Sequence, residues 1–172
     1  MYTQLIFIPI FLSLSLASPS PRYPLYSRQE NATVAAAAAN DGGVALFNGI
    51  GSNILVQQNE IASTMAIMSQ LSGPDAANKD VFNALKANLL TVVDSGVTIR
   101  ENNQKIAQLT GASQAATDGL NTVANAQKEE KSLSESLTGD PAKDMPTLQT
   151  MLTDFQGGIV QNQKNQQAAL VK

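Results

Sequence analysis

The stretch LKANLLTVVDSGVTIRENNQKI, residues 85–106, decides the fold of this chain. Its large apolar side chains recur every seven residues, at Leu85, Val92, Ile99 and Ile106. Because an α-helix has about 3.6 residues per turn, a seven-residue repeat keeps these side chains on one face. The stretch therefore predicts a long amphipathic helix whose four repeating residues are buried.

Helical spacing extends to the segments on both sides. The segment before this stretch has apolar residues at the same interval and others beside them: Phe47, Ile54, Ile61 and Met68, with Val44, Ile50, Met65 and Leu71. The last segment has five large apolar residues on one face: Leu148, Leu152, Phe155, Ile159 and Leu170. The segment between has a stripe that includes a carboxylate: Ala116, Leu120, Val123, Ala126, Glu130, Leu133 and Leu137. Spacings of three and four predict amphipathic helices throughout.

Three clusters of turn residues, at 72–75, 110–113 and 138–146, separate these segments. The four expected helices are about 43–71, 75–109, 113–138 and 146–170. Connections this short make neighbouring helices antiparallel. The sequence therefore predicts one all-α domain, residues 41–172, folded as an elongated up-and-down four-helix bundle.

The turn clusters also contain the residue types that begin and end helices. Asp75 and Ser113 are expected N-caps, and Asp144 before Pro146 supplies another helix start. Three glycines fit left-handed positions after helix ends: Gly73, Gly111 and Gly139.

Residues 1–40 are expected to serve targeting and connection. Residues 5–16 form an apolar run of twelve, and Ser15 and Ala17 are small residues where signal peptidase prefers them. The run is too short to cross a bilayer core of roughly 30 Å. We expect a signal peptide at 1–17, secretion to the extracellular space or the cell wall, and no transmembrane anchor.

Residues 18–40 are expected to form a disordered, proline-containing segment or propeptide, whose Ala-rich end is able to form a short helix. Processing after Arg28 is a further hypothesis. Asn31 begins the sequence Asn-Ala-Thr, which in a secreted chain is a candidate glycosylation site. The alternative is an unused sequon at the start of a helix.

Composition argues against several functional classes. The chain has no Cys, His or Trp, so it lacks thiol nucleophiles, the usual zinc ligands and the Glu-x-x-His pairs of diiron bundles. When Arg22 and Arg28 are excluded from the 11 basic residues, nine remain against 14 acidic ones, a net charge of −5. An acidic chain gains no counterion release with nucleic acid. We therefore expect a non-enzymatic protein that uses no metal or cofactor and binds no nucleic acid.

Amide side chains are abundant, and two interpretations of them stay open. Gln57 and Asn103 fall in or beside the apolar stripes of the first two helices, and Gln163 or Gln166 does so in the last. They either form a polar layer that sets helix register, as a buried Asn does in coiled coils, or lie in solvent.

An internal match at an offset of 45 residues relates Gly51, Ile54 and Ile61 to Gly96, Ile99 and Ile106. It also has two interpretations. Either part of the chain is duplicated, or ordinary helical periodicity produces the match.

Four methionines indicate a candidate apolar site: Met65, Met68, Met145 and Met151. In an up-and-down bundle, the C-terminal end of the first helix lies beside the N-terminal end of the last. Flexible methionine side chains suit a lipid-sized apolar ligand, although they also fill ordinary cores.

The organisation of residues 29–172 resembles that of a fungal secreted family, the hydrophobic-surface-binding and cell-wall galactomannoproteins. The resembling features are a signal peptide, a basic-ended segment closing at Arg28-Gln29, and a Cys-free helical domain rich in Ala, Gln, Thr and Leu. The resemblance implies a helical, non-enzymatic protein that binds apolar surfaces or fatty acids. The chain departs from that pattern at residues 154–158 and 161–165, and no binding residue carries over.

The leading functional hypothesis is a secreted, non-catalytic protein that binds an apolar small molecule or hydrophobic surface at or near the cell wall. The alternative is a secreted interaction or effector protein that uses its amide-rich helix faces on a protein partner.

Overall fold

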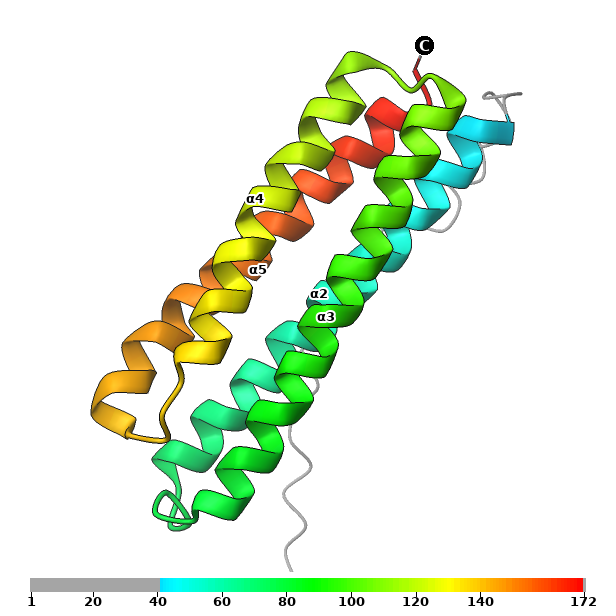
Figure 1. Cartoon of the computed structure of the whole chain (residues 1–172). Helices are drawn as coiled ribbons and strands as arrows, with labels where there is room; N and C mark the ends of the chain where they lie inside the picture. The colour runs from blue at the N-terminus through cyan, green and yellow to red at the C-terminus, as the bar shows by residue number, and fades with distance from the viewer. Residues whose placement is uncertain (1–40, 172) are drawn as a thin grey trace, which may run out of the picture.

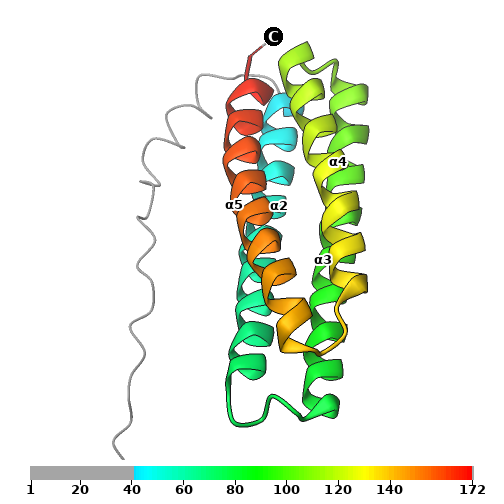
Figure 2. The same cartoon turned by 90° about the vertical axis from the view of Figure 1, so that its left-hand side faces the viewer.

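Four long helices form the described part of the chain, residues 41–171 of the computed structural model. They are α2 (Asp41–Ser72), α3 (Lys79–Thr110), α4 (Gln114–Ser136) and α5 (Pro141–Ala169). Each helix packs against its two neighbours in a closed ring, with α2 between α3 and α5 and α4 opposite (Figures 1 and 2). The expected up-and-down four-helix bundle is therefore confirmed. The expected signal peptide, residues 1–17, the segment 18–40 and Asn31 lie outside the described residues.

The start of α3 differs from the sequence prediction. Asn78, not Asp75, caps this helix, and its Oδ1 accepts a hydrogen bond from the amide of Val81 at 3.2 Å. The carbonyl of Asp75 instead accepts bonds from Asn78 N and Gln70 Nε2 within the turn. Gly73 has no positive φ, so its expected left-handed role is also wrong.

The start of α5 was expected at the wrong proline. Asp140 is the N-cap, with Oδ1 accepting from Ala142 N at 3.1 Å, and Pro141 opens the helix. Pro146 lies inside α5. Asp144 does not start the helix; its carboxylate accepts the amides of Thr138 and Gly139 and so closes the preceding connection.

The turn between α3 and α4 follows the prediction. Ser113 caps α4, with Oγ accepting from Ala116 N at 3.4 Å. Gly111 adopts φ 61°, and its amide donates to the carbonyl of Ala107. Gly139 is left-handed too, at φ 79°, although it lies in the connection after Leu137 rather than directly at the helix end.

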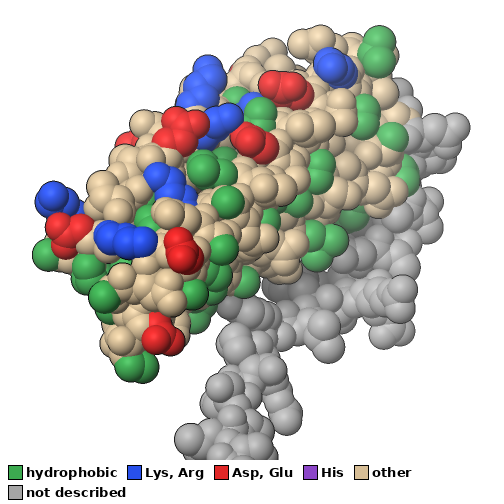
Figure 3. Space-filling view, turned by 60° about the horizontal axis from the view of Figure 1, so that its bottom comes forward, with side chains coloured by type: hydrophobic (Ala, Val, Ile, Leu, Met, Phe, Trp, Pro, Cys, Tyr) green, Lys and Arg blue, Asp and Glu red, His purple; other side chains and the backbone are tan. Residues whose placement is uncertain are grey.

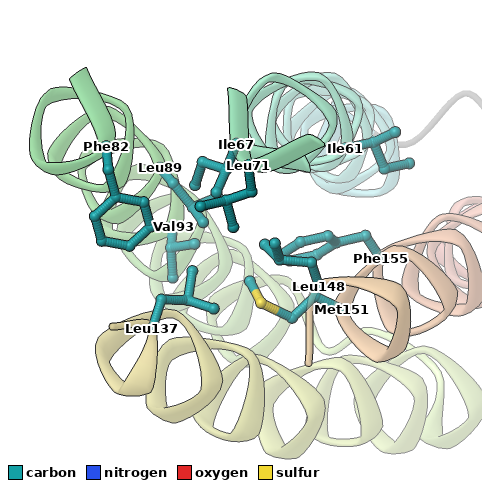
Figure 4. Close-up of a cluster of buried hydrophobic side chains, with 10 residues drawn as sticks. All are labelled: Ile61, Ile67, Leu71, Phe82, Leu89, Val93, Leu137, Leu148, Met151 and Phe155. Carbon is teal, nitrogen blue, oxygen red and sulfur yellow. The ribbon is translucent and has the colours of Figure 1, made fainter. Parts of the chain in front are cut away.

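Two apolar clusters build the core. The large cluster lies toward the α2–α3 turn, and Figure 4 shows most of its side chains pointing into the space between the helices, with Ile61 apart from the others. It comprises Ile61, Ile67, Leu71, Phe82, Leu89, Val93, Leu137, Leu148, Met151 and Phe155. The small cluster lies toward the α3–α4 connection and comprises Leu46, Ile50, Ala107, Ala116, Leu120 and Ala169.

The seven-residue stripe of α3 does not face this core. Leu85, Val92, Ile99 and Ile106 are all half-buried, so the prediction that they are buried was wrong. The buried face is instead Phe82, Leu89, Val93, Gly96, Arg100, Asn103 and Ala107. The apolar pattern predicted the wrong face because the middle of the buried face, at Gly96, Arg100 and Asn103, has no large apolar side chain.

The stripes of the other helices fit the core to different degrees. In α4, Ala116, Leu120, Val123, Glu130 and Leu137 are buried as predicted, whereas Ala126 and Leu133 are half-buried. In α5 two of the five predicted residues, Leu148 and Phe155, are buried. In α2 the buried face follows Leu46, Ile50, Asn53 and Gln57, so Phe47, Ile54 and Met68 lie at its edge.

The two helical hairpins repeat one buried pattern. Each of the seven buried residues of α3 corresponds to a buried residue of α5 that lies 62 positions later. The first such pair is Phe82 with Asp144, and the last is Ala107 with Ala169. Six buried residues of α2 correspond to buried residues of α4 that lie 70 positions later: Leu46, Ile50, Asn53, Gln57, Glu60 and Thr64 match Ala116, Leu120, Val123, Gln127, Glu130 and Ser134. The hairpin α2–α3 is the longer of the two and extends past the α4–α5 connection (Figure 1).

This hairpin repeat differs from the 45-residue match seen in the sequence. That match pairs Gly51, which is half-buried, with Gly96, which is buried, and the buried Ile61 with the half-buried Ile106. It therefore does not relate equivalent faces. The structure relates whole hairpins instead.

Candidate functional site

The four candidate methionines do not form one open site. Met151 is fully buried in the large cluster, and Met68 and Met145 pack against that cluster while partly buried. Met65 is 53% exposed and belongs to neither cluster. The expected meeting of the C-terminal half of α2 with the N-terminal half of α5 is confirmed, because both contribute to the large cluster. Three of the methionines act there as packing.

A polar layer separates the two apolar clusters, and sequence reasoning anticipated only part of it. Each helix contributes two residues three positions apart, all at most 5% exposed: Gln57 and Glu60, Arg100 and Asn103, Gln127 and Glu130, and Asn162 and Asn165. The interpretation of Gln57 and Asn103 as layer residues is confirmed. Gln163 is exposed, and Gln166 is half-buried and donates from Nε2 to the carbonyl of Phe47.

Four glycines make room for this layer. Four side-chain amides each lie where a Cβ would be on a glycine of the adjacent helix. The pairs are Asn103 with Gly49, Gln127 with Gly96, Asn165 with Gly119, and Gln57 with Gly158. On Gly96, for example, a Cβ would lie 2.9 Å from Gln127 Nε2 and 3.1 Å from Glu60 Oε1. Each long polar side chain therefore reaches across the core against a bare stretch of neighbouring backbone.

Equivalent hydrogen bonds close the layer in the two halves. Arg100 Nη1 donates to Gln127 Oε1 at 3.1 Å, and Asn162 Nδ2 donates to Gln57 Oε1 at 2.9 Å. Arg100 and Asn162 are equivalent in the hairpin repeat, as are Gln127 and Gln57. Arg100 Nη1 also donates to the carbonyl of Ala124, at 3.1 Å.

Many groups of the layer nevertheless have no partner. Both carboxylate oxygens of Glu60 and of Glu130 are buried without a hydrogen bond. The same is true of Asn53 Oδ1 and Nδ2, Gln57 Nε2, Arg100 Nε, Asn103 Nδ2 and Gln127 Nε2. An unpaired buried polar group costs about 1–3 kcal/mol of stability. The middle of the bundle therefore holds the helices together less firmly than its apolar ends.

Burial sets the ionisation of the two glutamates. It raises the pKa of Glu60 to about 9, with a further contribution from the charge of Glu130. It raises the pKa of Glu130 to about 7, to which the charge on Asp154 adds and from which the charge on Arg100 subtracts. Burial also lowers the pKa of Arg100. At neutral pH Glu60 is therefore a neutral carboxylic acid.

Polar contacts cross the seam between α3 and α4 at several places. Lys86 Nζ donates to the carbonyls of Glu135 and Leu137 at 2.7 and 2.6 Å, at the end of α4. Lys131 Nζ lies 2.8 Å from Asp94 Oδ1 in an exposed ion pair. α4 is also the shortest helix and packs less extensively on its neighbours than α2 does. The contacts between α3 and α4 are therefore the ones most readily replaced by contacts with water.

A groove of about 230 Å³ lies between α4 and α5 on the outer side of the polar layer. Its lining is Thr122, Val123, Ala126, Glu129, Thr153, Asp154, Gly157, Gly158 and Gln161. Neither Glu129 nor Asp154 has an ion-pair partner within 4.0 Å among the described residues. Glu129 lines the groove while its neighbour Glu130 is buried, so the two adjacent carboxylates point in different directions. Sequence reasoning did not identify this groove, although the pair Gly157-Gly158 was a signal for it.

In residues 41–171, no group of three or more Asp, Glu, His or Cys side chains is placed to hold a metal ion. No helix in that range has the length and apolarity needed to cross a membrane.

The chain matches no family model, no curated protein and no solved structure.

Proposed function

We propose that this is a secreted, non-catalytic binding protein that takes up an apolar small molecule, or attaches to a hydrophobic surface, by parting its bundle along the α3–α4 seam. The unpaired polar layer carries this proposal. When the seam opens, Glu60, Glu130 and the amides of the layer form hydrogen bonds with water, which removes the free-energy cost of burying them unpaired. The same groups make the closed state less stable than an apolar core would.

Opening would present apolar surface on both sides of the layer. The large cluster offers ten buried residues, among them Phe155 and the flexible Met151. Side chains of this kind adapt to ligands of irregular apolar shape. The small cluster lies at the opposite end, so an elongated ligand or a flat apolar surface would contact both.

The closed surface favours this reading over docking on a protein partner. The large apolar residues that are exposed lie on different helices and at the chain end: Leu55, Met65, Val81, Leu109, Val160 and Val171. Figure 3 shows hydrophobic side chains distributed among polar ones over the face in view. Protein-binding sites usually need a contiguous patch. The effector hypothesis therefore has less support.

Secretion and cell-wall association rest on the sequence alone. The apolar run at residues 5–16 and the organisation that resembles the hydrophobic-surface-binding family support them.

A cross-link across the seam tests the proposal. The chain has no cysteine, so the double variant Asp94→Cys, Lys131→Cys can be joined selectively with a short, cleavable bismaleimide. Ser63 and Asn88 give the matched control, because their side chains meet at 3.1 Å between α2 and α3, within one hairpin. Adsorption to polystyrene beads and fluorescence of N-phenyl-1-naphthylamine report apolar binding.

We expect the seam cross-link to weaken both signals by about tenfold, which is a change of about 1.4 kcal/mol, and cleavage of the linker to restore them. The control cross-link should leave them unchanged. Equal binding by the open and the seam-locked protein would contradict the proposal, and a protein that binds neither probe would favour the effector alternative.

A further inference from the structure

The hairpin repeat shows what is special about the groove between α4 and α5. Three of its lining residues, Ala126, Asp154 and Gln161, correspond in the first hairpin to Val56, Val92 and Ile99. Where the first hairpin has three large apolar side chains, the second hairpin has the smaller Ala126 and the polar Asp154 and Gln161.

Packing at the equivalent glycines agrees with this difference. A Cβ on Gly96 would lie 3.3 Å from Val56 Cγ1, so the first seam is filled at this level. On Gly158, its equivalent, the three nearest atoms all belong to Gln57 and reach 3.8 Å, so Ala126 lies farther away than Val56 does in the first seam. The second seam is therefore less filled by this side chain than the first.

The groove has a consistent negative charge. Glu129 and Asp154 line it without an ion-pair partner among residues 41–171. Glu130 does not line the groove but is 1% exposed, with both carboxylate oxygens unpaired; burial raises its pKa, and the charges of Asp154 and Glu129 add to this. The facing cation from α3, Arg100, is committed to Gln127 and the carbonyl of Ala124. Two carboxylates therefore line the groove, and their charges act on a third, buried carboxyl group.

The remaining lining defines the size and kind of ligand. Val123 and Ala126 supply apolar walls, and the hydroxyls of Thr122 and Thr153 donate to their own helices, which leaves their oxygens free to accept. The volume of about 230 Å³ holds several water molecules but is below the roughly 300–1,000 Å³ of pockets for drug-sized ligands.

We propose that this groove binds a small organic cation, namely a primary ammonium group on a short aliphatic chain, as in a simple alkylamine or polyamine. The ammonium group lies between Asp154 and Glu129 and donates to their oxygens, and the methylene groups lie on Val123 and Ala126. This site does not depend on the opening of the bundle.

Titration of the full-length secreted protein with n-butylamine and with 1,4-diaminobutane at neutral pH tests the site, followed by amide chemical shifts in ¹H–¹⁵N spectra. Butan-1-ol is the uncharged probe of the same shape. We expect saturable shifts confined to residues around 122–130 and 153–161 with both amines and none with the alcohol. Shifts that map elsewhere, or an equal response to butan-1-ol, would overturn the proposal.

Variants taken from the chain itself provide the controls. Asp154→Asn should raise the Kd for n-butylamine by roughly tenfold, which corresponds to about 1.4 kcal/mol. Asp118→Asn removes an exposed carboxylate of α4 that accepts from Gln114, outside the groove, and should leave the Kd unchanged. Equal effects of these two variants would show that only net charge matters and would refute the site.

The triple variant Ala126→Val, Asp154→Val, Gln161→Ile gives the second seam the residues of the first. It should abolish amine binding while the circular dichroism spectrum stays helical, and retained binding would overturn the proposal. If Nα-acetyl-lysine amide bound more than tenfold tighter than n-butylamine, the ligand would be a protein lysine rather than a small amine, and the proposal as stated would fall.

Discussion

Glu60 and Glu130 are the residues whose environment departs furthest from that of an ordinary core. Both lie at the centre of the bundle, and neither carboxylate has a hydrogen-bond partner. Burial raises both pKa values, to about 9 and about 7. The folded state therefore holds protons that the unfolded chain, with a pKa of 4.5 at each glutamate, releases.

This difference predicts that stability falls as pH rises. Above pH 4.5 the folded state binds more protons than the unfolded state, so each extra proton lowers the unfolding free energy by about 1.4 kcal/mol per pH unit. The loss through Glu130 ends near pH 7, and that through Glu60 near pH 9. Urea unfolding at pH 5 and pH 8 should therefore show the higher stability at pH 5.

Glu60→Gln should reduce this pH dependence, because an amide stays neutral while its shape is preserved. At pH 8 the variant should be more stable than the natural chain. Glu135→Gln, at an exposed position of α4, is the control and should change neither value much. A natural chain that is equally stable at pH 5 and pH 8 would show that the two carboxyl groups are solvated in the folded state.

Two adjacent glycines of α5 allow a second test at this scale. A Cβ on Gly157 would meet no atom within 4 Å, so Gly157→Ala should stabilise the helix by about 0.5–1 kcal/mol. A Cβ on Gly158 would collide with Gln57 Nε2 and lie 3.2 Å from its Cδ. Gln57 cannot move away easily, because its Oε1 accepts a hydrogen bond from Asn162. Gly158→Ala should therefore be the less stable of the two by about 2 kcal/mol, part of which is overpacking. Thermal melts compare the two, and equal stability would mean that the layer can shift freely.

At the scale of the element, α3 shows how a regular apolar repeat can mark the wrong face. Its seven-residue stripe lies at the edge of the core, where Leu85 packs against the large cluster and Ile106 against the small one. The true face continues from Leu89 and Val93 into Gly96 and Arg100. Gly96 and Arg100 have no large apolar side chain, so the buried face gives a weaker apolar pattern in the sequence than the seven-residue stripe beside it.

The two faces predict different costs of truncation. Leu89 is fully buried, so Leu89→Ala should lower the unfolding free energy by about 2–5 kcal/mol. Ile99 is half-buried, and Ile99→Ala should cost clearly less. Chemical denaturation of both variants measures the difference. A larger loss at Ile99 would show that α3 is rotated relative to the face described above.

At the scale of the whole molecule, the bundle is two similar hairpins joined across a polar layer. α2 packs extensively on both neighbours, whereas α4 is shorter and its seam with α3 is polar. Local opening should therefore involve α4 first, because few buried apolar contacts resist it.

Native-state hydrogen exchange measures this order. Amides in the middle of α4, residues 120–130, should exchange through openings of lower free energy than amides in the middle of α2, residues 54–64. Segments of equal length and central position make the comparison independent of end fraying. Equal protection of both helices would contradict an opening at the α3–α4 seam and would also weaken the proposed function.

The amino-acid sequence by itself determined the number of helices, their antiparallel order and the cap at Ser113, because these depend on local spacing and on turn residues. It also placed the carboxylate of Glu130 in the stripe of α4. Local chemistry was insufficient at Asp75 and Asp144, where the geometry of the turn decided which polar side chain caps the helix.

Only the tertiary structure decided which face of α3 is buried, that Glu60 and Arg100 join the core, and that the groove beside Asp154 exists. The physical reason is that a buried polar residue is compatible with the core only when a partner helix offers space for it. That space comes from Gly49, Gly96, Gly119 and Gly158, each on the helix adjacent to the side chain that it accommodates. Spacing along one helix contains no information about its neighbour, so the hairpin repeat and its open seam become visible only when the four helices are packed together.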